Sequence, residues 1–513
     1  MNSLPLNSLA SANSPDTSEQ VLPVDVVLSQ PDHDALLRHL LQNDHEQHAF
    51  LLAGLCFGES SVRLLVREII FAQPHDFLRQ TSSYLELKPS YYLPVLDRCR
   101  HEGLHIVEVH SHTFCGAGVT FSPVDIGNEW EKFPWYAEKL PGIWVGTLVF
   151  GHASVDGHWF DAPAGQIRPL RLLRVVGRTP LDREMTSWRA TDLANLAGDD
   201  LIVKNNDATH FVRQELAFGS EGQRRIATAR IGLLGTGGLG SIVAALLSRQ
   251  GARIWTIVDP DRIELSNLNR VAFAWPEDAA ERRPKVEVIA RGICDIRRDA
   301  HVLTVQNSVD SPIARKALRE VDLLISAPDN DGARLVANEL ATSYLLPLVD
   351  LGSGINVRDG AVVEAGGQML WRFPGEGCLH CAGAINNQRA RIDLMTTEER
   401  ARHEARGYGT SSPQPSVMFL NATLAGLAVG EITKWLTGLA EPCAMLIYDA
   451  LAPSVRTISS PGRNAACAVC HPRALYGRGD ETHLDEVFSQ PAPATGNETP
   501  TERDEEEPHV VES

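Results

Sequence analysis

Three polar residues after an apolar segment have the types and spacing of a metal site. His110, His112 and Asp125 belong to the pattern H-x-H-x9-S-x2-D. In a strand, residues i and i+2 point to the same face, so both imidazoles can approach one metal ion. Ser122 suits an N-cap and Pro123 a first helical position, which places Asp125 in the first turn of a helix. Two imidazoles and one carboxylate leave a fourth position for water, the pattern of a catalytic zinc.

A metal-bound water also needs a group that accepts its proton. Glu46 precedes the apolar stretch 48–57, and a carboxylate there could take this proton and pass it to a leaving amine. Glu59 is a second candidate near the same stretch. H-x-H by itself is also typical of two exposed histidines on a strand edge, but the added serine and aspartate favour the metal site.

This set resembles the motif of the JAMM metalloproteases, also called the JAB or MPN family: a glutamate, then H-S-H, then S-x-x-D. The resemblance implies that His110, His112 and Asp125 bind zinc, that Glu46 is the base and that Ser122 stabilises the oxyanion. The stretch before Ser122 is longer than is usual in the family. That difference motivates an alternative, in which this part of the chain has lost catalysis and serves only as a binding module.

A second group of residues has the spacing of a nucleotide site. An apolar strand expected at 231–234 runs into a G-x-G-x-x-G turn, a helix is expected at 241–249, and a strand at 253–258 ends at Asp259. The glycines of the turn are Gly235, Gly237, Gly238 and Gly240. They let the backbone approach phosphates at a helix N-terminus, and Asp259 would hold ribose hydroxyls. Such a turn can also serve plain helix–strand packing, but the surrounding elements favour nucleotide binding.

Polar and basic residues downstream indicate which nucleotide binds. Arg270 and Lys285 could neutralise a triphosphate, and Asn267 could hydrogen-bond it. A strand expected at 321–326 is followed by Asp329, whose carboxylate is placed to hold magnesium at the same crevice. An NAD site would need few of these groups. The combination favours ATP over NAD, and an NAD oxidoreductase is the remote alternative.

This string closely resembles the ThiF/MoeB family, whose fold is shared by ubiquitin-activating enzymes. The matching pieces are the glycine turn, D-x-D at Asp259 and Asp261, S-N-L-N-R ending at Arg270, Lys285, and D-N beginning at Asp329. The family chemistry is adenylation, in which a C-terminal carboxylate attacks the α-phosphate of ATP. The segment around Arg213 resembles the upstream R-Q element, which implies that Arg213 reaches the ATP site of a neighbouring subunit and that the protein is a homodimer.

Four cysteines form two C-x-x-C pairs, and a fifth lies between them. The pairs are Cys378 with Cys381 and Cys467 with Cys470. Four thiolates make a closed tetrahedral zinc site; a redox role is the alternative, but two matched pairs in one block favour zinc. The resembling family carries the same pairs. No cysteine lies at 409–426, where ubiquitin-activating relatives have a thioester-forming cysteine, and Cys443 is expected to be a structural thiol. Adenylation without an internal thioester is therefore expected.

Two units must position these residues. Irregularly mixed strands and helices predict an α+β JAB/MPN-like unit, and the βαβ pattern predicts an α/β Rossmann-like ThiF unit with a mostly parallel sheet. The predicted boundaries are 1–22 (disordered), 23–174 (JAB/MPN-like), 175–204 (linker), 205–477 (ThiF/MoeB-like, with the four-cysteine zinc site) and 478–513 (disordered acidic tail).

Composition narrows the function further. The 513 residues carry a formal net charge of −18, which argues against a nucleic-acid partner. Neither a signal pattern nor a run of about eighteen apolar residues is visible, so no membrane association and a cytoplasmic location are expected. The sequence predicts ATP- and Mg²⁺-dependent adenylation of the C-terminal carboxylate of a ubiquitin-like or sulfur-carrier protein, joined to zinc-dependent isopeptidase processing of such a protein. Adenylation of a peptide or small-molecule carboxylate in biosynthesis is the alternative.

Overall fold

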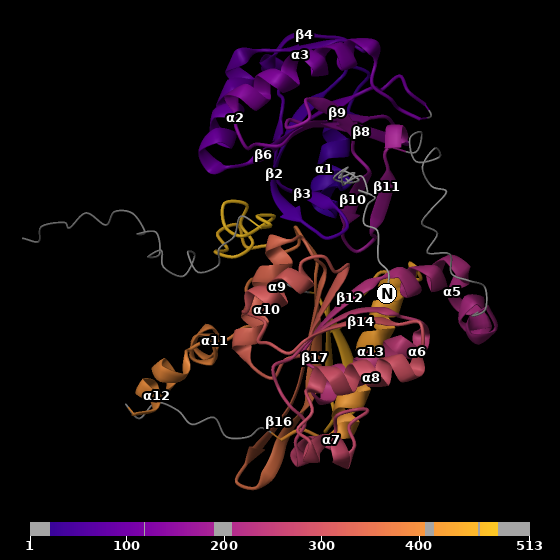
Figure 1. The fold of residues 1–513 in the computed structure, drawn as a ribbon, viewed down its shortest axis with the longest axis vertical. Coiled ribbons are helices and arrows are strands. Elements are labelled where there is room, and N and C mark those ends of the chain that lie inside the picture. The colour runs from indigo at the N-terminus through magenta and orange to yellow at the C-terminus, as the bar shows by residue number, and fades with distance from the viewer. Residues whose placement is uncertain (1–20, 117, 189–207, 406–414, 460–461, 481–513) are drawn as a thin grey trace, which may run out of the picture.

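The computed structural model describes residues 21–116, 118–188, 208–405, 415–459 and 462–480. They form two units, each built on a sheet of its own (Figure 1). The predicted disordered segments lie almost wholly outside these ranges, as does the greater part of the predicted linker.

The N-terminal unit is built on a nine-stranded mixed sheet in the order β11-β10-β1-β3-β2-β6-β7-β8-β9. Its strands are β1 (Val24–Ser29), β2 (His48–Phe57), β3 (Val62–Phe71), β6 (His105–Ser111), β7 (Val145–Phe150), β8 (Val155–Asp161), β9 (Gln166–Pro169), β10 (Leu172–Val176) and β11 (Leu181–Glu184). A small hairpin, β4 (Phe77–Gln80) and β5 (Leu85–Leu87), follows a 3₁₀ turn at Pro74–Asp76. The helices are α1 (Gln30–Leu40), α2 (Pro89–Glu102) and α3 (Pro123–Lys139).

Helices cover both faces of this sheet, which explains why its central strand β2 is almost wholly apolar. One face packs against α1 and the other against α2 and α3. Nine of the ten residues of β2 are buried, because the strand lies between these two layers. Strands β2 and β3 pair antiparallel as a hairpin, and α2 follows the small hairpin of β4 and β5. Helix α2 begins at Pro89 and is terminated by Gly103, whose φ of 67° suits a left-handed cap.

The C-terminal unit is an α/β fold with an eight-stranded, mostly parallel sheet, as predicted, in the order β14-β13-β12-β15-β16-β17-β18-β19. Its strands are β12 (Arg230–Leu234), β13 (Ile254–Val258), β14 (His301–Val305), β15 (Leu323–Ser326), β16 (Leu348–Arg358), β17 (Ala361–Arg372), β18 (Met445–Asp449) and β19 (Ser454–Ile458). Five neighbouring strands are parallel: β14, β13, β12, β15 and β16. The strands β17, β18 and β19 continue the sheet, each antiparallel to the strand before it.

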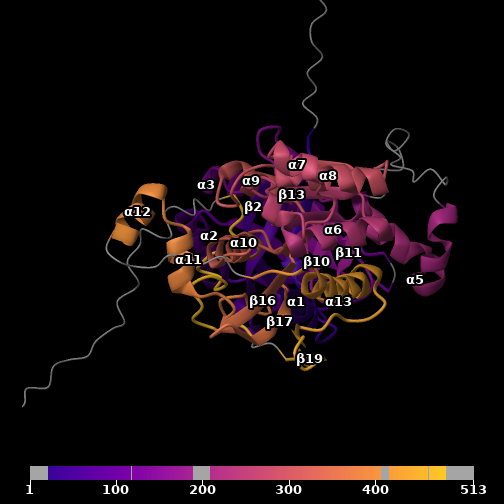
Figure 2. The ribbon, with the colours of Figure 1, turned by 90° about the horizontal axis from the view of Figure 1, so that it is seen from below.

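The helices of this unit are α5 (Ala208–Thr228), α6 (Gly238–Gln250), α7 (Pro276–Ala280), α8 (Lys285–Ile296), α9 (Pro312–Leu318), α10 (Asp331–Ser343), α11 (Asn387–Asp393), α12 (Thr397–Ala405) and α13 (Met418–Thr437), with a 3₁₀ turn at Leu265–Asn267. Helices α6, α8 and α13 pack on one face of the sheet, and α9 and α10 pack on the other. Helices α5 and α12 lie on opposite sides of the C-terminal unit, as seen in both Figure 1 and Figure 2. Within the described ranges, no helix combines the length and apolarity needed to cross a bilayer.

Two predicted boundaries differ from the structure. Strand β10 continues to Val176, β11 pairs with it, and Met185 is fully buried, so the N-terminal unit extends past the predicted start of the linker at 175. The pairing along β10 was missed because β11 is short and polar. The predicted tail also begins too early, since Gly479 bridges to Leu55 of β2 and is held in place by tertiary contacts.

Candidate functional sites

The glycine turn lies at the point where the order of the parallel sheet reverses. Strand β12 has β13 on one side and β15 on the other, so the loops after β12 and β15 open into one crevice at the carboxyl ends of the strands. Gly235 has a φ of 84°, and a Cβ on it would lie 2.6 Å from the carbonyl oxygen of Ala327. A Cβ on Gly240 would lie 2.0 Å from the carbonyl of Gly235. These two glycines shape the turn and let α6 pack close to the strand.

Gly237 differs from its neighbours because it borders open space. It is the N-cap of α6, it makes no side-chain capping bond, and a Cβ on it would meet nothing within 4 Å. The first backbone N–H groups of α6 have no partner inside the helix. This end of the helix therefore has the character of an anion site.

Of the three side chains expected around the triphosphate and its magnesium, Arg270 lies beside this turn, and Asp329 is near enough to Lys285 for its charge to act on it. The aliphatic part of Arg270 lies 3.3 Å from the Cβ position of Gly238. The Nζ of Lys285 lies 2.8 Å from Asp261, and the charges of Asp259 and Asp329 also act on it. Burial opposes the charged form of Lys285, but these carboxylates outweigh burial and raise its pKa, so the ammonium group stays protonated at neutral pH.

Asp259 makes a contact other than the one expected from the sequence. Its Oδ2 accepts hydrogen bonds from the N–H and hydroxyl of Thr236, and its Oδ1 accepts one from the N–H of Asp261. The side chain is buried, and burial raises its pKa. Asp259 thus holds the glycine turn in shape, and its expected role on ribose stays a prediction.

Asn267 serves the turn that carries Arg270. Its Oδ1 accepts a hydrogen bond from the N–H of Glu264, and its carbonyl oxygen accepts from the N–H of Arg270 at 3.0 Å. The side chain is buried. Its contribution is therefore to position Arg270 over the glycine turn, in addition to any bond that it makes to a phosphate.

Two polar groups near the crevice were not found from the sequence. Asn421, on α13, has its amide nitrogen 2.4 Å from the Cβ position of Gly238, and its Oδ1 accepts from the hydroxyl of Ser353. Asp350 is fully buried at β16, where its Oδ1 accepts from the hydroxyl of Ser326. No motif marks either residue, although a buried asparagine in an apolar helix was a usable signal for Asn421.

Arg213 lies on α5, near the start of the unit. Its side chain is exposed, and so are those of Val212 and Leu216, the latter at 84%. A solvent-exposed arginine flanked by exposed apolar side chains has the composition of an interface between protein chains.

The four paired cysteines converge although the pairs lie 89 residues apart. The Sγ–Sγ distances are 3.9 Å between Cys378 and Cys381, 3.7 Å between Cys378 and Cys467, and 3.5 Å between Cys381 and Cys470. A zinc ion with four sulfur ligands at about 2.3 Å requires sulfurs about 3.8 Å apart. The thiols form no disulfide, and the donor set fits a closed tetrahedral zinc site.

Cys443 has the surroundings of a structural thiol. It is half-buried, and its N–H donates to the carboxylate of Glu431. Burial and the charge of Glu431 raise the pKa of Cys443 to about 11, which disfavours the nucleophilic thiolate. Of the segment 409–426, which contains no cysteine, residues 409–414 lie outside the described residues.

In the N-terminal unit, the residues of the H-x-H…D pattern meet at the end of β6 and the start of α3. The Nε2 atoms of His110 and His112 are 3.2 Å apart, and they lie 3.6 and 3.4 Å from the carboxylate oxygens of Asp125. Burial favours the neutral form of Asp125, but the hydrogen bonds of the two histidines outweigh burial and hold its pKa well below the usual range. The three groups form a candidate metal site, and two imidazoles with one carboxylate fit zinc with a position left for water.

Sheet pairing decides which glutamate lies beside this cluster. Strand β2 pairs antiparallel with β6, with His48 opposite His110, and this register places Glu46 next to His112. The Oε1 of Glu46 is 3.7 Å from the Nε2 of His112, and burial raises the pKa of Glu46. Glu59, the alternative, follows the other end of β2, where it is exposed.

Ser122 is the N-cap of α3 and joins Asp125 in a capping box. Its hydroxyl oxygen accepts from the N–H of Asp125 at 3.2 Å, and the Asp125 carboxylate accepts from the N–H of Ser122 at 2.7 Å. These bonds orient the carboxylate toward the histidines. A hydroxyl that accepts can still donate, so the expected oxyanion contact from Ser122 is compatible with the cap.

A hollow of about 260 Å³ lies along α3 and is lined in part by Ile126, Trp130 and His158. The ring of His158 stacks on Phe121 at 4.4 Å, and Phe121 lies 5.9 Å from the ring of His110. Phe121 therefore lies between the ring of His110 and the His158 ring that lines the hollow.

Known proteins resemble the C-terminal unit. The ThiF family matches residues 211–469. A sulfur carrier protein adenylyltransferase of Thermus thermophilus is 30% identical over 49% of this chain and 86% of its own length. An adenylyltransferase and sulfurtransferase MOCS3-1 of Zea mays is 26% identical over 53% of this chain and 53% of its own length. A crystal structure of Escherichia coli MccB with ATP is 19% identical over 51% of this chain and 74% of that chain, at a TM-score of 0.41, which is too low to carry an inference.

The chain belongs to the ThiF family. It spans about half the length of the maize relatives that it matches. The family match leaves the nine-stranded N-terminal unit outside its limits.

Proposed function

We propose that the C-terminal unit adenylates the C-terminal carboxylate of a ubiquitin-like or sulfur-carrier protein at the expense of ATP. Relatives in Thermus thermophilus, Bacillus subtilis and Escherichia coli carry the names of sulfur carrier protein adenylyltransferases. The observation that supports the proposal is the position of Arg270 beside Gly238, together with the cation of Lys285, whose pKa the nearby charges of Asp259, Asp261 and Asp329 raise.

The reaction requires that negative charge be held while one bond forms and another breaks. A carboxylate oxygen of the substrate attacks the α-phosphorus of ATP, the bond from that phosphorus to the bridging oxygen breaks, and pyrophosphate leaves with the electron pair. Arg270 and Lys285 would neutralise the phosphate oxygens, the free N–H groups at the start of α6 would bind them, and Asp329 would hold magnesium. The protein therefore contributes positioning and charge stabilisation.

Exchange of labelled pyrophosphate into ATP tests this proposal. The assay contains the protein, magnesium and a panel of small β-grasp proteins that end in Gly-Gly, each beside a copy whose C-terminus is amidated. We expect exchange with at least one free carboxylate and none with its amide. Normal ATP binding without exchange on any carrier would refute the proposed substrate class, and exchange with small carboxylates alone would favour the biosynthetic alternative.

We further propose that the N-terminal unit is a JAB/MPN-like zinc peptidase that cleaves an amide at the C-terminus of such a protein. His110, His112 and Asp125 would hold the zinc ion, which supplies an acidic water and polarises the scissile carbonyl. Glu46 would accept the proton of the attacking water and donate it to the leaving amine, and Ser122 would donate to the oxyanion. The supporting observation is the 3.7 Å approach of Glu46 to His112.

A fusion of a carrier protein to a C-terminal peptide provides the assay. We expect hydrolysis by the wild type and its loss in Glu46→Gln, while zinc content stays unchanged. Glu59→Gln is the matched control, because this glutamate follows the far end of the same strand and is exposed. If the fusion binds but no carrier is ever cleaved, the unit is a binding module and not a peptidase.

We also propose that the active form is a homodimer through the start of α5. Arg213 would reach the crevice of the partner subunit, and the exposed Val212 and Leu216 would be covered in the interface. Mixing the Arg213→Ala variant with the Lys285→Ala variant tests whether one crevice contains residues of both subunits. Each variant alone should be inactive, and the mixture should recover part of the exchange activity if one crevice combines residues of two chains.

A further inference from the structure

A segment of nine residues, which begins two residues after Cys470, runs between the two units. This strap (Pro472–Asp480) belongs to the yellow segment between the sheets in Figure 1. Its Gly479 forms a parallel bridge with Leu55 of the N-terminal unit, and the N–H of Asp480 donates to the carbonyl of Leu55 at 2.7 Å. On the other side, the N–H of Gly479 donates to the carbonyl of Ser343 at the end of α10, at 2.9 Å. The strap is thus hydrogen-bonded to both units through its backbone.

Close backbone packing fixes the path of the strap. A Cβ on Gly479, where φ is +63°, would lie 1.9 Å from the carbonyl oxygen of Leu55. A Cβ on Gly54 would lie 2.4 Å from the carbonyl oxygen of Gly477. Glycine is required at both contacts because no side chain fits between the two chain segments.

Side chains add polar contacts at both ends of the strap. The guanidinium of Arg67, on β3, donates to the carbonyls of Tyr476 and Pro472. The carboxylate of Asp480 accepts from the N–H of Phe57 at 2.7 Å and from Arg319 at 2.8 Å. These contacts cross from one unit to the other.

An apolar cluster is also shared between the units. Tyr476 packs with Val27, Cys56 and Leu65 of the N-terminal unit and with Leu345 of the C-terminal unit, and it is 2% exposed. Its hydroxyl donates to the carboxylate of Asp32 at 3.1 Å. A buried aromatic side chain with a satisfied hydroxyl is a typical anchor of a protein interface.

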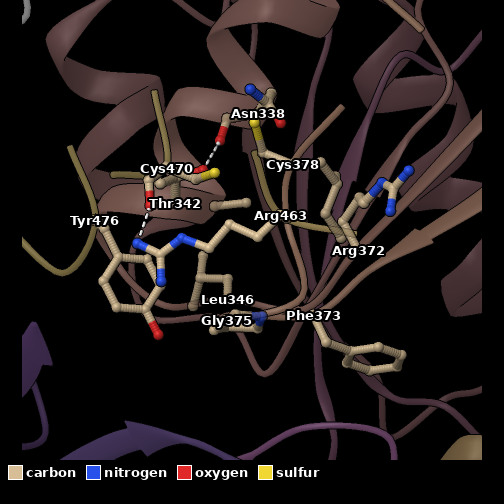
Figure 3. A pocket seen from close by; sticks show the side chains of 14 residues that line it. Asn338, Thr342, Leu346, Arg372, Phe373, Gly375, Cys378, Arg463, Cys470 and Tyr476 are labelled. Atoms are coloured by element: carbon tan, nitrogen blue, oxygen red, sulfur yellow. Dashed lines mark hydrogen bonds between the residues drawn. The ribbon is translucent and has the colours of Figure 1, made fainter. Parts of the chain in front are cut away.

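The strap begins next to the four-cysteine site, and Figure 3 shows the side chains that join them. The guanidinium of Arg463 donates to the carbonyl of Cys470 at 2.5 Å and lies 4.8 Å from the centre of the Tyr476 ring. Arg372 is buried and lines a cavity of about 20 Å³, which Arg463 and Tyr476 also line. The cavity has room for about one water. A zinc ion with four thiolates carries a net negative charge, and Arg372 and Arg463 are placed to balance it.

We propose that the four-cysteine site and the strap form a zinc-dependent clamp that fixes the two units as one body. Zinc ties residues 378–381 to residues 467–470 and so anchors the start of the strap, while Arg67, Tyr476 and Asp480 dock it on the N-terminal unit. When the metal is removed, the start of the strap is no longer anchored, and the strap no longer keeps its position between the two units. The inference stands apart from both proposed activities, so its failure would leave them untouched.

The full-length chain with a site-specific protease sequence placed within residues 189–207 tests the clamp. His112→Ala serves as the background, so that a chelator acts on the four-cysteine site alone. After cleavage, we expect the two fragments to elute together in size-exclusion chromatography while zinc is present, and to separate once zinc is removed. Circular dichroism of each separated fragment checks that it remains folded. Separation with zinc bound, or co-elution after complete zinc removal, would overturn the proposal.

Variants on the N-terminal side test the strap without touching a zinc ligand. Arg67→Ala removes both bonds to strap carbonyls, and we expect association of the cleaved fragments to weaken at least about tenfold. Arg100→Ala is the matched control, because Arg100 is exposed and pairs with Asp97 within its own helix. Equal association in the two variants, each with its zinc retained, would show that the strap does not hold the units together.

Discussion

Both candidate active sites lie where a helix begins, but the two helices begin differently. Helix α6 starts at Gly237, which offers no side-chain cap and borders open space. Helix α3 starts at Ser122, whose capping box with Asp125 satisfies backbone N–H groups of the first turn. The first helix keeps its donors for a ligand, whereas in the second the Ser122 hydroxyl accepts from the N–H of Asp125 and the Asp125 carboxylate accepts from the N–H of Ser122.

This difference matches the charge of the ligand that each site suits. An uncapped N-terminus attracts phosphate through its N–H groups and its dipole. A capped N-terminus neutralises those donors and orients a carboxylate, which with two imidazoles attracts a cation. The same element of secondary structure thus supports opposite chemistry, depending on a single N-cap residue.

The largest effect is expected at the phosphate side. Lys285→Ala removes a half-buried cation that pairs with Asp261, and we expect pyrophosphate exchange to fall by about 10²- to 10³-fold. Lys434→Ala is the control, since Lys434 pairs with Glu431 near the far end of α13. Unchanged exchange in Lys285→Ala would mean that the crevice does not bind the triphosphate as proposed.

Metal content tests the cation side. We expect about two zinc ions per chain in the wild type and about one in His112→Ala, because the closed four-cysteine site keeps its metal. Mass spectrometry under native conditions counts the ions. A single zinc already in the wild type would argue that the His–Asp cluster is not a zinc site.

Each unit contains a buried carboxyl group with a shifted pKa, and the two shifts have opposite directions. Burial raises the pKa of Glu339 on α10 to about 7, whereas Lys132 and other partners outweigh burial and lower the pKa of Glu108 in the N-terminal unit. The stability that protonated Glu339 contributes is present below its unfolded pKa and is lost as pH rises through about 7.

Glu339→Gln mimics the protonated form. It should stabilise the C-terminal unit by about 1 to 3 kcal/mol at pH 8 and have little effect at pH 5. Amide hydrogen exchange along α10 measures the difference, and equal protection at both pH values would contradict the assignment.

A smaller effect is expected from filling the open N-cap. Gly237→Ala creates no clash in the protein, so the fold should persist while ATP binds about tenfold more weakly, because phosphate approaches the backbone there. Gly240→Ala, whose Cβ would lie 2.0 Å from a carbonyl oxygen, should instead lower the melting temperature. Calorimetric titration with ATP separates the two outcomes, and undiminished ATP affinity in Gly237→Ala would place the phosphates elsewhere.

The smallest effect concerns the capped helix. Ser122→Ala removes one capping acceptor and should lower the free energy of unfolding of the N-terminal unit by about 1 kcal/mol. Denaturant titration followed by tryptophan fluorescence measures this change. Loss of zinc in this variant would show that the cap also holds Asp125 in place for the metal, whereas full zinc retention would show that Asp125 keeps its position without the cap.

The sequence by itself determined the features that rest on local geometry. Alternation along a strand places His110 and His112 on one face, and the S-x-x-D pattern builds the capping box of Asp125. The glycine turn between β12 and α6 follows from the same short-range rules. Each of these depends on hydrogen bonds and dihedral angles within a few residues.

Only the tertiary structure decided which distant residues join them. Antiparallel pairing of β2 with β6 brings Glu46, and not Glu59, to the histidines. Packing of α13 against α6 places Asn421 beside Gly238, and the strap brings Tyr476 into a core that both units share. These contacts depend on sheet register and helix packing between segments far apart in the chain, and no short-range pattern encodes either of them.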